Sequence, residues 1–174
     1  MKIIFLDIDG VLNCRSTKER INGYIGIDPK KVELLKLIVD ATGAKIILSS
    51  SWRQCRDSIL MRKMWDYMVE SLKSQELEIF DITPYDCETS YRGFEIQTWF
   101  KEHKDKNIES FIILDDDCDL KPYGSRHIQT AYFKNGLEQK HVDKAIKMLG
   151  EECRPWFDEA PYWREEYNAD NRQI

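Results

Sequence analysis

The 174-residue sequence lacks the features that mark several specialised classes of protein. Eight glycines and five prolines are too few for a collagen-like or low-complexity chain. No apolar stretch approaches the roughly 20 residues that a membrane-spanning helix needs. The apolar run at residues 3–6 ends at Asp7 and is shorter than the apolar core of a secretory signal, which has about 7–15 residues. We therefore expect one globular domain without a membrane segment.

The cysteines show no regular spacing. There are five of them, an odd number, and no CxxC pair occurs, so neither a zinc knuckle nor a thioredoxin-like redox site is indicated. This usage is typical of reduced thiols and predicts a cytoplasmic protein. A GxxxxGK[ST] motif is also missing, which gives no support to a P-loop kinase activity.

The chain also lacks the basic excess of a bulk nucleic-acid-binding protein, because 26 Lys and Arg stand against 31 Asp and Glu. The acidity is uneven. Residues 151–174 hold seven acids and three arginines, whereas residues 1–150 have a net charge of only −1. Six acids of residues 1–150 lie in or next to the acidic clusters described below, namely Asp7, Asp9, Asp115, Asp116, Asp117 and Asp119. Without them this part holds 18 acids and 23 bases. The net charge therefore does not exclude a polyanionic substrate.

The hydrophobic pattern predicts strands that alternate with helices. Residues 3–6, 46–48 and 111–114 are short β-branched or aromatic runs, typical of parallel strands buried on both faces. We expect a further strand at 127–133 and helices over about 29–42, 55–74, 93–104 and 138–149. This alternation predicts an α/β fold of three layers, a Rossmann-like parallel sheet flanked by helices.

Polar clusters follow three of these strands, at the sheet edge where ligands bind in such folds. They are Asp7-Ile8-Asp9-Gly10, Ser49-Ser50-Ser51 and Asp115-Asp116-Asp117. An extended Asp-x-Asp points both carboxylates to one side, and their repulsion favours a cation between them. Oxygen ligands without His or Cys suit Mg²⁺, and serine hydroxyls near a helix start suit phosphate. The clusters together predict phosphoryl-transfer chemistry.

These residues resemble the motifs of the haloacid-dehalogenase-like (HAD) superfamily. Residues 5–12 resemble its first motif, residues 48–49 its second and residues 112–116 its fourth, over about residues 2–150. Within the superfamily, a longer set of sequence segments is similar to the HAD domains that occur beside RNA-repair enzymes in Swiss Army Knife proteins. These segments are Leu48-Ser49-Ser50-Ser51-Trp52-Arg53, Thr83-Pro84, Arg92-Gly93, Glu95-Ile96 and Gly136-Leu137.

The resemblance implies a role for each motif residue. Asp7 would be the nucleophile that forms an aspartyl-phosphate, and Asp9 would protonate the leaving oxygen and later activate water. Ser49 and Arg92 would contact the phosphoryl group. The metal residues would be Asp7, Asp9 (through its backbone carbonyl), Asp115 and Asp116, with Mg²⁺ as cofactor, and the substrate-binding residues Gly10, Ser50 and Arg53.

Some assignments stay open from the sequence. Ser50 is an alternative to Ser49 as the second-motif residue, and Asp116 ranks before Asp115 as the metal ligand. Lys101, Lys104 and Lys121 are alternatives to Arg92. Trp52 could equally belong to the core or contact the substrate. Asp119 is expected to support the site from outside the set of metal ligands.

We expect a hydrolase domain over residues 1–150, with small insertions at about 13–28 and 54–91 that build only a minimal cap. Residues 151–174 contain five aromatic residues and predict an extension that packs on the domain or on a partner subunit, as monomer or dimer. The predicted function is a Mg²⁺-dependent phosphatase that hydrolyses a phosphate monoester, with nucleic-acid ends as a substrate class. The alternatives are a phosphatase for small metabolites or nucleotides, and an inactive HAD-like binding module.

Overall fold

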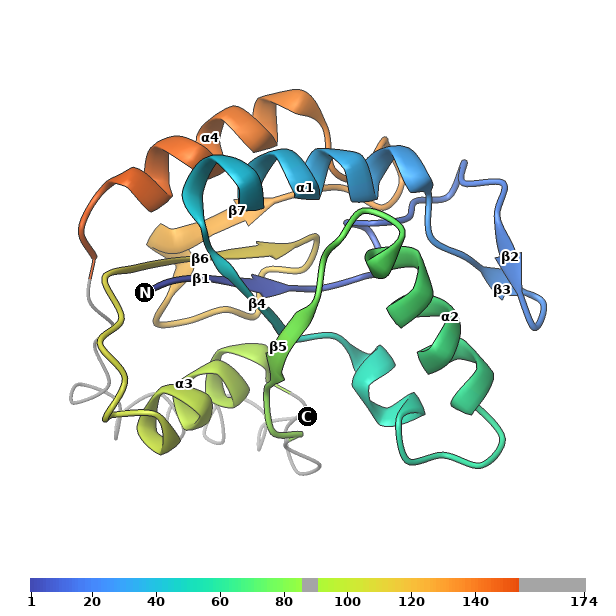
Figure 1. Cartoon of the computed structure of the whole chain (residues 1–174), viewed down its shortest axis with the longest axis horizontal. Coiled ribbons are helices and arrows are strands. Elements are labelled where there is room, and N and C mark those ends of the chain that lie inside the picture. The colour runs from blue at the N-terminus through green and yellow to red at the C-terminus, as the bar shows by residue number, and fades with distance from the viewer. Residues whose placement is uncertain (86–90, 154–174) are drawn as a thin grey trace, which may run out of the picture.

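The computed structural model describes residues 1–85 and 91–153, so the predicted packing of the C-terminal extension falls, from residue 154 on, outside the described residues. Five parallel strands form the main sheet, in the order β5-β4-β1-β6-β7 (Figure 1). The strands are β1 (Lys2–Leu6), β4 (Lys45–Leu48), β5 (Ile79–Ile82), β6 (Ser110–Asp115) and β7 (His127–Gln129). The helices are α1 (Pro29–Thr42), α2 (Arg62–Lys73), α3 (Arg92–Glu102) and α4 (Gln139–Gly150).

The chain enters the sheet at its centre and fills one side before the other. From β1 it adds β4 and then β5, crosses over, and adds β6 and β7 on the opposite side. The strand order therefore reverses between β1 and β6, the kind of position where α/β sheets bind ligands. In the ladder, Leu6 pairs with both Leu48 and Leu114, so β1 and β4 end at the same level and β6 runs one residue further.

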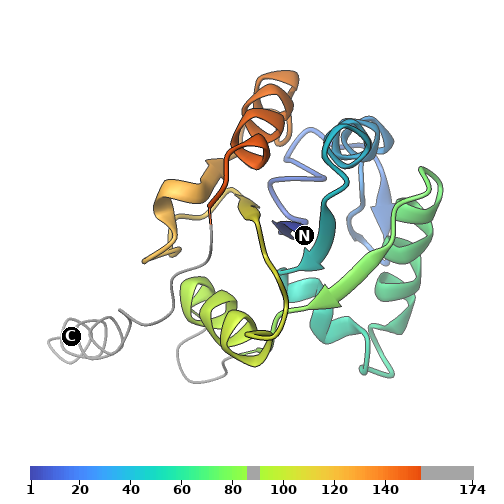
Figure 2. The same cartoon turned by 60° about the vertical axis from the view of Figure 1, so that its left-hand side comes forward.

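Alternate residues of the central strands fill two cores. Ile4 and Leu6 pack with apolar residues of α1, α2 and α4 on one face of the sheet. Ile3 and Phe5 pack with Trp99 and Phe100 of α3 on the other face. Figure 2 shows the resulting layers, with α1 and α4 above the sheet and α3 below it. The predicted three-layer α/β fold is confirmed.

The first helix starts and stops where its sequence predicts. The carboxylate of Asp28 accepts a hydrogen bond from the backbone N–H of Lys30, and Pro29 occupies the first turn. Gly43 ends the helix in the left-handed conformation, with a φ of 66°.

Two predicted elements are wrong in extent. The helix expected over 55–74 begins only at Arg62, and residues 51–55 form a separate 3₁₀ turn, η1 (Ser51–Cys55). Ser58 caps a turn by accepting from the N–H of Met61, so Leu60 falls outside the helix and is 87% exposed. The strand expected over 127–133 stops at Gln129, because a turn begins immediately after Thr130.

Two further elements were not predicted. The edge strand β5 lies inside the segment expected to be an insertion, so residues 79–82 belong to the main sheet. A short antiparallel hairpin, β2 (Arg20–Ile21) with β3 (Tyr24–Ile25), lies in the segment 13–28. Within the described parts of the chain, no helix is both long and apolar enough to cross a membrane.

Candidate active site

The first residue after β1, β4, β5 and β7 extends the ladder by one more backbone hydrogen bond. The N–H of Asp7 donates to the carbonyl of Leu114 at 2.9 Å, and the N–H of Ser49 donates to that of Leu6 at 2.8 Å. Across the sheet, the residues at this level are Thr83, Ser49, Asp7, Asp115 and Gln129. Three of the predicted site residues are thus placed side by side by the backbone itself.

Three carboxylates gather at the switch point between β1 and β6. One carboxylate oxygen each of Asp7, Asp115 and Asp116 lies within 4.8 Å of the other two. Gly10 makes this approach possible, because a Cβ at this position would lie 2.2 Å from Cγ of Asp116. In the structure, Gly10 leaves room for the side chain of Asp116 and adopts a φ of 76°.

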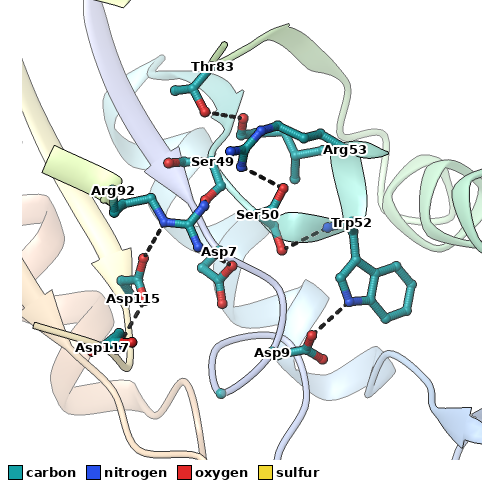
Figure 3. A network of polar contacts seen from close by, with 12 residues as sticks. Asp7, Asp9, Ser49, Ser50, Trp52, Arg53, Thr83, Arg92, Asp115 and Asp117 are labelled. Atoms are coloured by element: carbon teal, nitrogen blue, oxygen red, sulfur yellow. Dashed lines mark hydrogen bonds and ion pairs between the residues drawn. The ribbon is translucent and has the colours of Figure 1, made fainter. Parts of the chain in front are cut away.

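Arg92 lies at the start of α3 and bridges two of these carboxylates (Figure 3). Its Nη2 is 3.5 Å from Oδ1 of Asp7, and its Nε is 3.4 Å from Oδ2 of Asp115. Its Nη1 also donates to the carbonyl of Ser49. Asp119 accepts a hydrogen bond from the backbone N–H of Arg92 at 2.9 Å, which holds the helix start beside the carboxylates.

The site holds several carboxylates that are buried close together. Burial raises the pKa of Asp7 to about 7, although Arg92 and a hydrogen bond from Ser50 act in the opposite direction. Burial and the nearby Asp7 raise the pKa of Asp115 to about 8, again against the effect of Arg92. One guanidinium does not compensate three clustered carboxylates, so the arrangement favours a bound cation.

The two candidate serines of the second motif differ in their contacts. Ser50 is the N-cap of η1 and accepts from the N–H of Trp52 at 3.4 Å, while its hydroxyl also reaches Asp7. The hydroxyl of Ser49 is buried and has no hydrogen-bond partner among the described residues. Because buried polar atoms normally have partners, the Ser49 hydroxyl is suited to a ligand oxygen.

The side chain of Asp9 points away from the three-carboxylate cluster (Figure 3). Its Oδ2 accepts from the indole Nε1 of Trp52 at 2.9 Å, and its Oδ1 accepts from the amide of Asn13 at 2.7 Å. Trp52 is buried, so it belongs to the interior and positions Asp9 through its N–H. The sequence left the role of Trp52 open and did not single out Asn13.

Arg53 is buried and lines a small cavity together with Arg92 and Glu95. Its Nη1 donates to the carbonyl of Ser50 at 2.7 Å, and its Nη2 pairs with Oε1 of Glu95. Glu95 is only 2% exposed and its other oxygen lies 3.6 Å from Arg92. Glu95 therefore joins the two arginines, a role that the sequence signals only through a buried glutamate near the start of a helix.

Comparison with known families agrees with this geometry. Residues 3–142 match the family described as the HAD domain in Swiss Army Knife RNA repair proteins. The chain belongs to this family. Membership of this HAD family indicates a hydrolase of the phosphatase type. No curated protein sequence matches the chain at a significant level.

Proposed function

We propose that this HAD domain is a Mg²⁺-dependent phosphatase that hydrolyses phosphate monoesters through an aspartyl-phosphate on Asp7. The observation that carries the proposal is the bridge made by Arg92 between Asp7 and Asp115, beside the unpartnered hydroxyl of Ser49. A nucleophile, a fixed cation and a free hydroxyl then surround the place of one phosphoryl group.

The carboxylate cluster fits Mg²⁺. Three carboxylates with hard oxygen donors converge within 4.8 Å, and the space that a Cβ of residue 10 would fill is left to Asp116. Asp7, Asp115 and Asp116 would hold the ion, together with the backbone carbonyl of Asp9. The bound ion would neutralise charge on the phosphoryl oxygens and on the carboxylates.

The two motif aspartates divide the chemistry. An oxygen of Asp7 attacks phosphorus and the ester oxygen leaves, taking a proton from Asp9. Asp9 then removes a proton from the water that hydrolyses the aspartyl-phosphate, which returns both side chains to their starting state. Trp52 and Asn13 hold the carboxylate of Asp9 from two directions and so fix where the proton is delivered.

The phosphoryl oxygens are expected to face Ser49 and Arg92. The Ser49 hydroxyl would donate to one oxygen, and the guanidinium of Arg92 would stabilise the charge that spreads over the others. Ser50 supports the nucleophile by its hydrogen bond to Asp7.

The test is phosphate release from p-nitrophenyl phosphate with and without Mg²⁺. We expect turnover with Mg²⁺ and none after its removal, and we expect Asp7→Asn to abolish turnover while leaving the thermal unfolding curve intact. No release by the wild-type protein from p-nitrophenyl phosphate or from any natural phosphate monoester would favour the alternative, a binding module of the same fold.

We further propose that the substrate is the phosphorylated end of a nucleic acid. The cap consists of one hairpin and one helix, which suits a site that admits a phosphate on a large partner. The matched family is named for RNA repair proteins. Comparing an end-phosphorylated oligonucleotide with the matching mononucleotide tests this, because equal or better turnover of the mononucleotide would favour a small-molecule phosphatase.

A further inference from the structure

A groove of about 490 Å³ opens beside the carboxylate of Asp9. Its walls come from three separate parts of the chain: the hairpin β2–β3, the η1–α2 region, and the turn after β7. The residues that line it are Asp9, Gly23, Tyr24, Ile25, Trp52, Met64 and Tyr132. Asp9 and Trp52 belong to the sequence motifs, but the motifs did not predict a groove at this place.

Hydrogen bonds join two of these walls to neighbouring segments of the chain. The hydroxyl of Tyr67 on α2 accepts from the N–H of Ile27 at 3.0 Å, which ties α2 to the chain just after the hairpin. The carbonyl of Tyr132 accepts from the N–H of Arg15 at 3.0 Å, which ties the third wall to the loop before the hairpin. The groove is therefore a built feature of the small cap.

The position of the groove assigns it to the leaving group. The carboxylate of Asp9 is held toward Trp52 and lines the groove, whereas Asp7, Asp115 and Asp116 do not line it. The groove therefore opens beside the carboxylate cluster, next to Asp9. In the proposed reaction Asp9 protonates the departing oxygen, and the part of the substrate that carries this oxygen must lie on the Asp9 side.

The lining is aromatic and almost uncharged. Tyr24 is 56% exposed, Tyr132 is half-buried, and Asp9 supplies the one charged side chain among the described residues of the lining. Next to Tyr132, the ring of Phe133 is exposed and carries the guanidinium of Arg15 at 5.9 Å. Aromatic faces combined with arginine at the rim are the features that bind single-stranded nucleic acid by stacking and by charge.

We infer that this groove binds the base of the phosphorylated terminal nucleotide, stacked against Tyr24 and Tyr132, while Arg15 faces the next phosphate of the strand. This assignment rests on the proposed phosphatase function and specifies its substrate as a nucleoside with a phosphate monoester. Strands with a 5′-terminal phosphate and strands with a 3′-terminal phosphate both carry such a monoester, and the experiment below distinguishes them.

The experiment compares short oligoribonucleotides that carry a 5′- or 3′-terminal phosphate on either a normal or an abasic terminal residue. We expect the wild-type protein to have a kcat/KM about tenfold higher for the base-bearing end, in line with the usual effect of one stacking aromatic residue. Tyr24→Ala and Tyr132→Ala should lower kcat/KM about tenfold on the base-bearing end and less than about twofold on the abasic end.

Phe80→Ala is the matched control, because Phe80 is a similarly exposed aromatic residue (48%) on the edge strand β5, outside the groove lining. It should leave both rates unchanged. Equal rates of the wild-type protein on base-bearing and abasic ends would overturn the groove assignment and leave the phosphatase proposal intact. A clear preference for a phosphotyrosine peptide over both oligonucleotides would also overturn it.

A binding measurement keeps the two proposals separable. Fluorescence anisotropy of Asp7→Asn with the same labelled oligonucleotides should show tighter binding of the base-bearing end, and this preference should be lost when Tyr24→Ala is added. If no variant and no substrate gives phosphate release, the phosphatase proposal fails, and equal affinity for both oligonucleotides would then overturn the groove assignment as well.

Discussion

The indole N–H of Trp52 donates to the carboxylate of Asp9 over 2.9 Å and joins the second motif to the first across 43 residues of sequence. Asn13 holds the other oxygen of the same carboxylate. Asp9 is thereby held toward Trp52, outside the group of Asp7, Asp115 and Asp116 that is proposed to share the cation.

Removing this indole N–H should slow the reaction without unfolding the protein. Trp52→Phe keeps an aromatic ring in the same buried space, and a lost hydrogen bond to a charged group typically costs about 1.5–3 kcal/mol. We expect kcat to fall by about tenfold or more, with a smaller change in KM. The measurement is steady-state phosphate release.

Trp99→Phe is the control for this change. Trp99 also donates its indole N–H to a carboxylate, that of Asp81 at 2.8 Å, but it lies on α3 in the core beneath the sheet. It should lower the melting temperature and leave kcat unchanged. If both tryptophan variants lost the same fraction of kcat, Trp52 would have no specific role in positioning Asp9.

Gly10→Ala should remove both activity and Mg²⁺-dependent stabilisation. The new Cβ would lie 2.2 Å from Cγ of Asp116, so the carboxylate must move out of the cluster. Gly43→Ala is the comparison, because Gly43 has a similar φ of 66° but nothing within 4 Å of its added Cβ. It should cost only the backbone strain, about 1–2 kcal/mol, and retain full activity. Calorimetry and turnover together distinguish the two outcomes.

Glu95→Gln should destabilise the fold strongly. Glu95 is the buried partner of Arg53, whose side chain is 4% exposed, and it also lies beside Arg92. Leaving a buried guanidinium uncompensated costs about 3–5 kcal/mol. Urea denaturation should show a loss of this size in the free energy of unfolding.

The exposed pair Arg62–Asp66 provides the contrast for the Glu95 variant. Its side chains are 58% and 54% exposed at a separation of 2.9 Å, so Asp66→Asn should cost about 0.5 kcal/mol or less. Similar losses for Glu95→Gln and Asp66→Asn would contradict the assignment of Glu95 as the buried link between the two arginines.

The stability of the fold should fall as the pH rises, and Mg²⁺ should reduce this fall. The pKa values of Asp7 and Asp115 in the fold are about 7 and about 8, above the ordinary value of 3.8. Their protonation therefore stabilises the fold fully below about pH 4, and this contribution is lost as the pH rises through 7 and 8. Without divalent metal, the melting temperature should fall between about pH 6.5 and about pH 8.5.

Mg²⁺ competes with protons for the same oxygens, so it should raise the melting temperature more at the upper end of this range than at the lower end. Burial lowers the pKa of His127 and His141, so both titrate mainly below this range. Asp115→Asn should weaken the pH dependence. A Mg²⁺ effect of equal size at both ends would contradict this account of the cluster.

Much of this architecture follows from the sequence because its signals are local. Buried β-branched runs predict the central strands, and Asp28, Pro29 and Gly43 predict the ends of α1. Parallel strands bring their carboxyl ends together, so Asp7, Ser49 and Asp115 could be expected at one edge without knowing any side-chain contact.

The remaining features depend on contacts between distant segments. The edge strand β5 is short and only partly buried, so its residues lack a continuous apolar run. The helical spacing that ends at Leu60 is interrupted by a turn that Ser58 caps, and spacing alone cannot detect this. The links from Trp52 to Asp9 and from Glu95 to Arg53 each join residues more than 40 positions apart, and no local pattern specifies such pairs.

The ladder hydrogen bonds of Asp7 and Ser49 have a consequence for the dynamics of the site. Their amide protons belong to the central strands, so their exchange with solvent requires the sheet itself to open. The backbone of Asp7 and Ser49, the proposed nucleophile and phosphate contact, is thereby protected up to the global unfolding of the domain. The hairpin and α2 lie outside this ladder, so their amide protons can exchange without opening of the central strands.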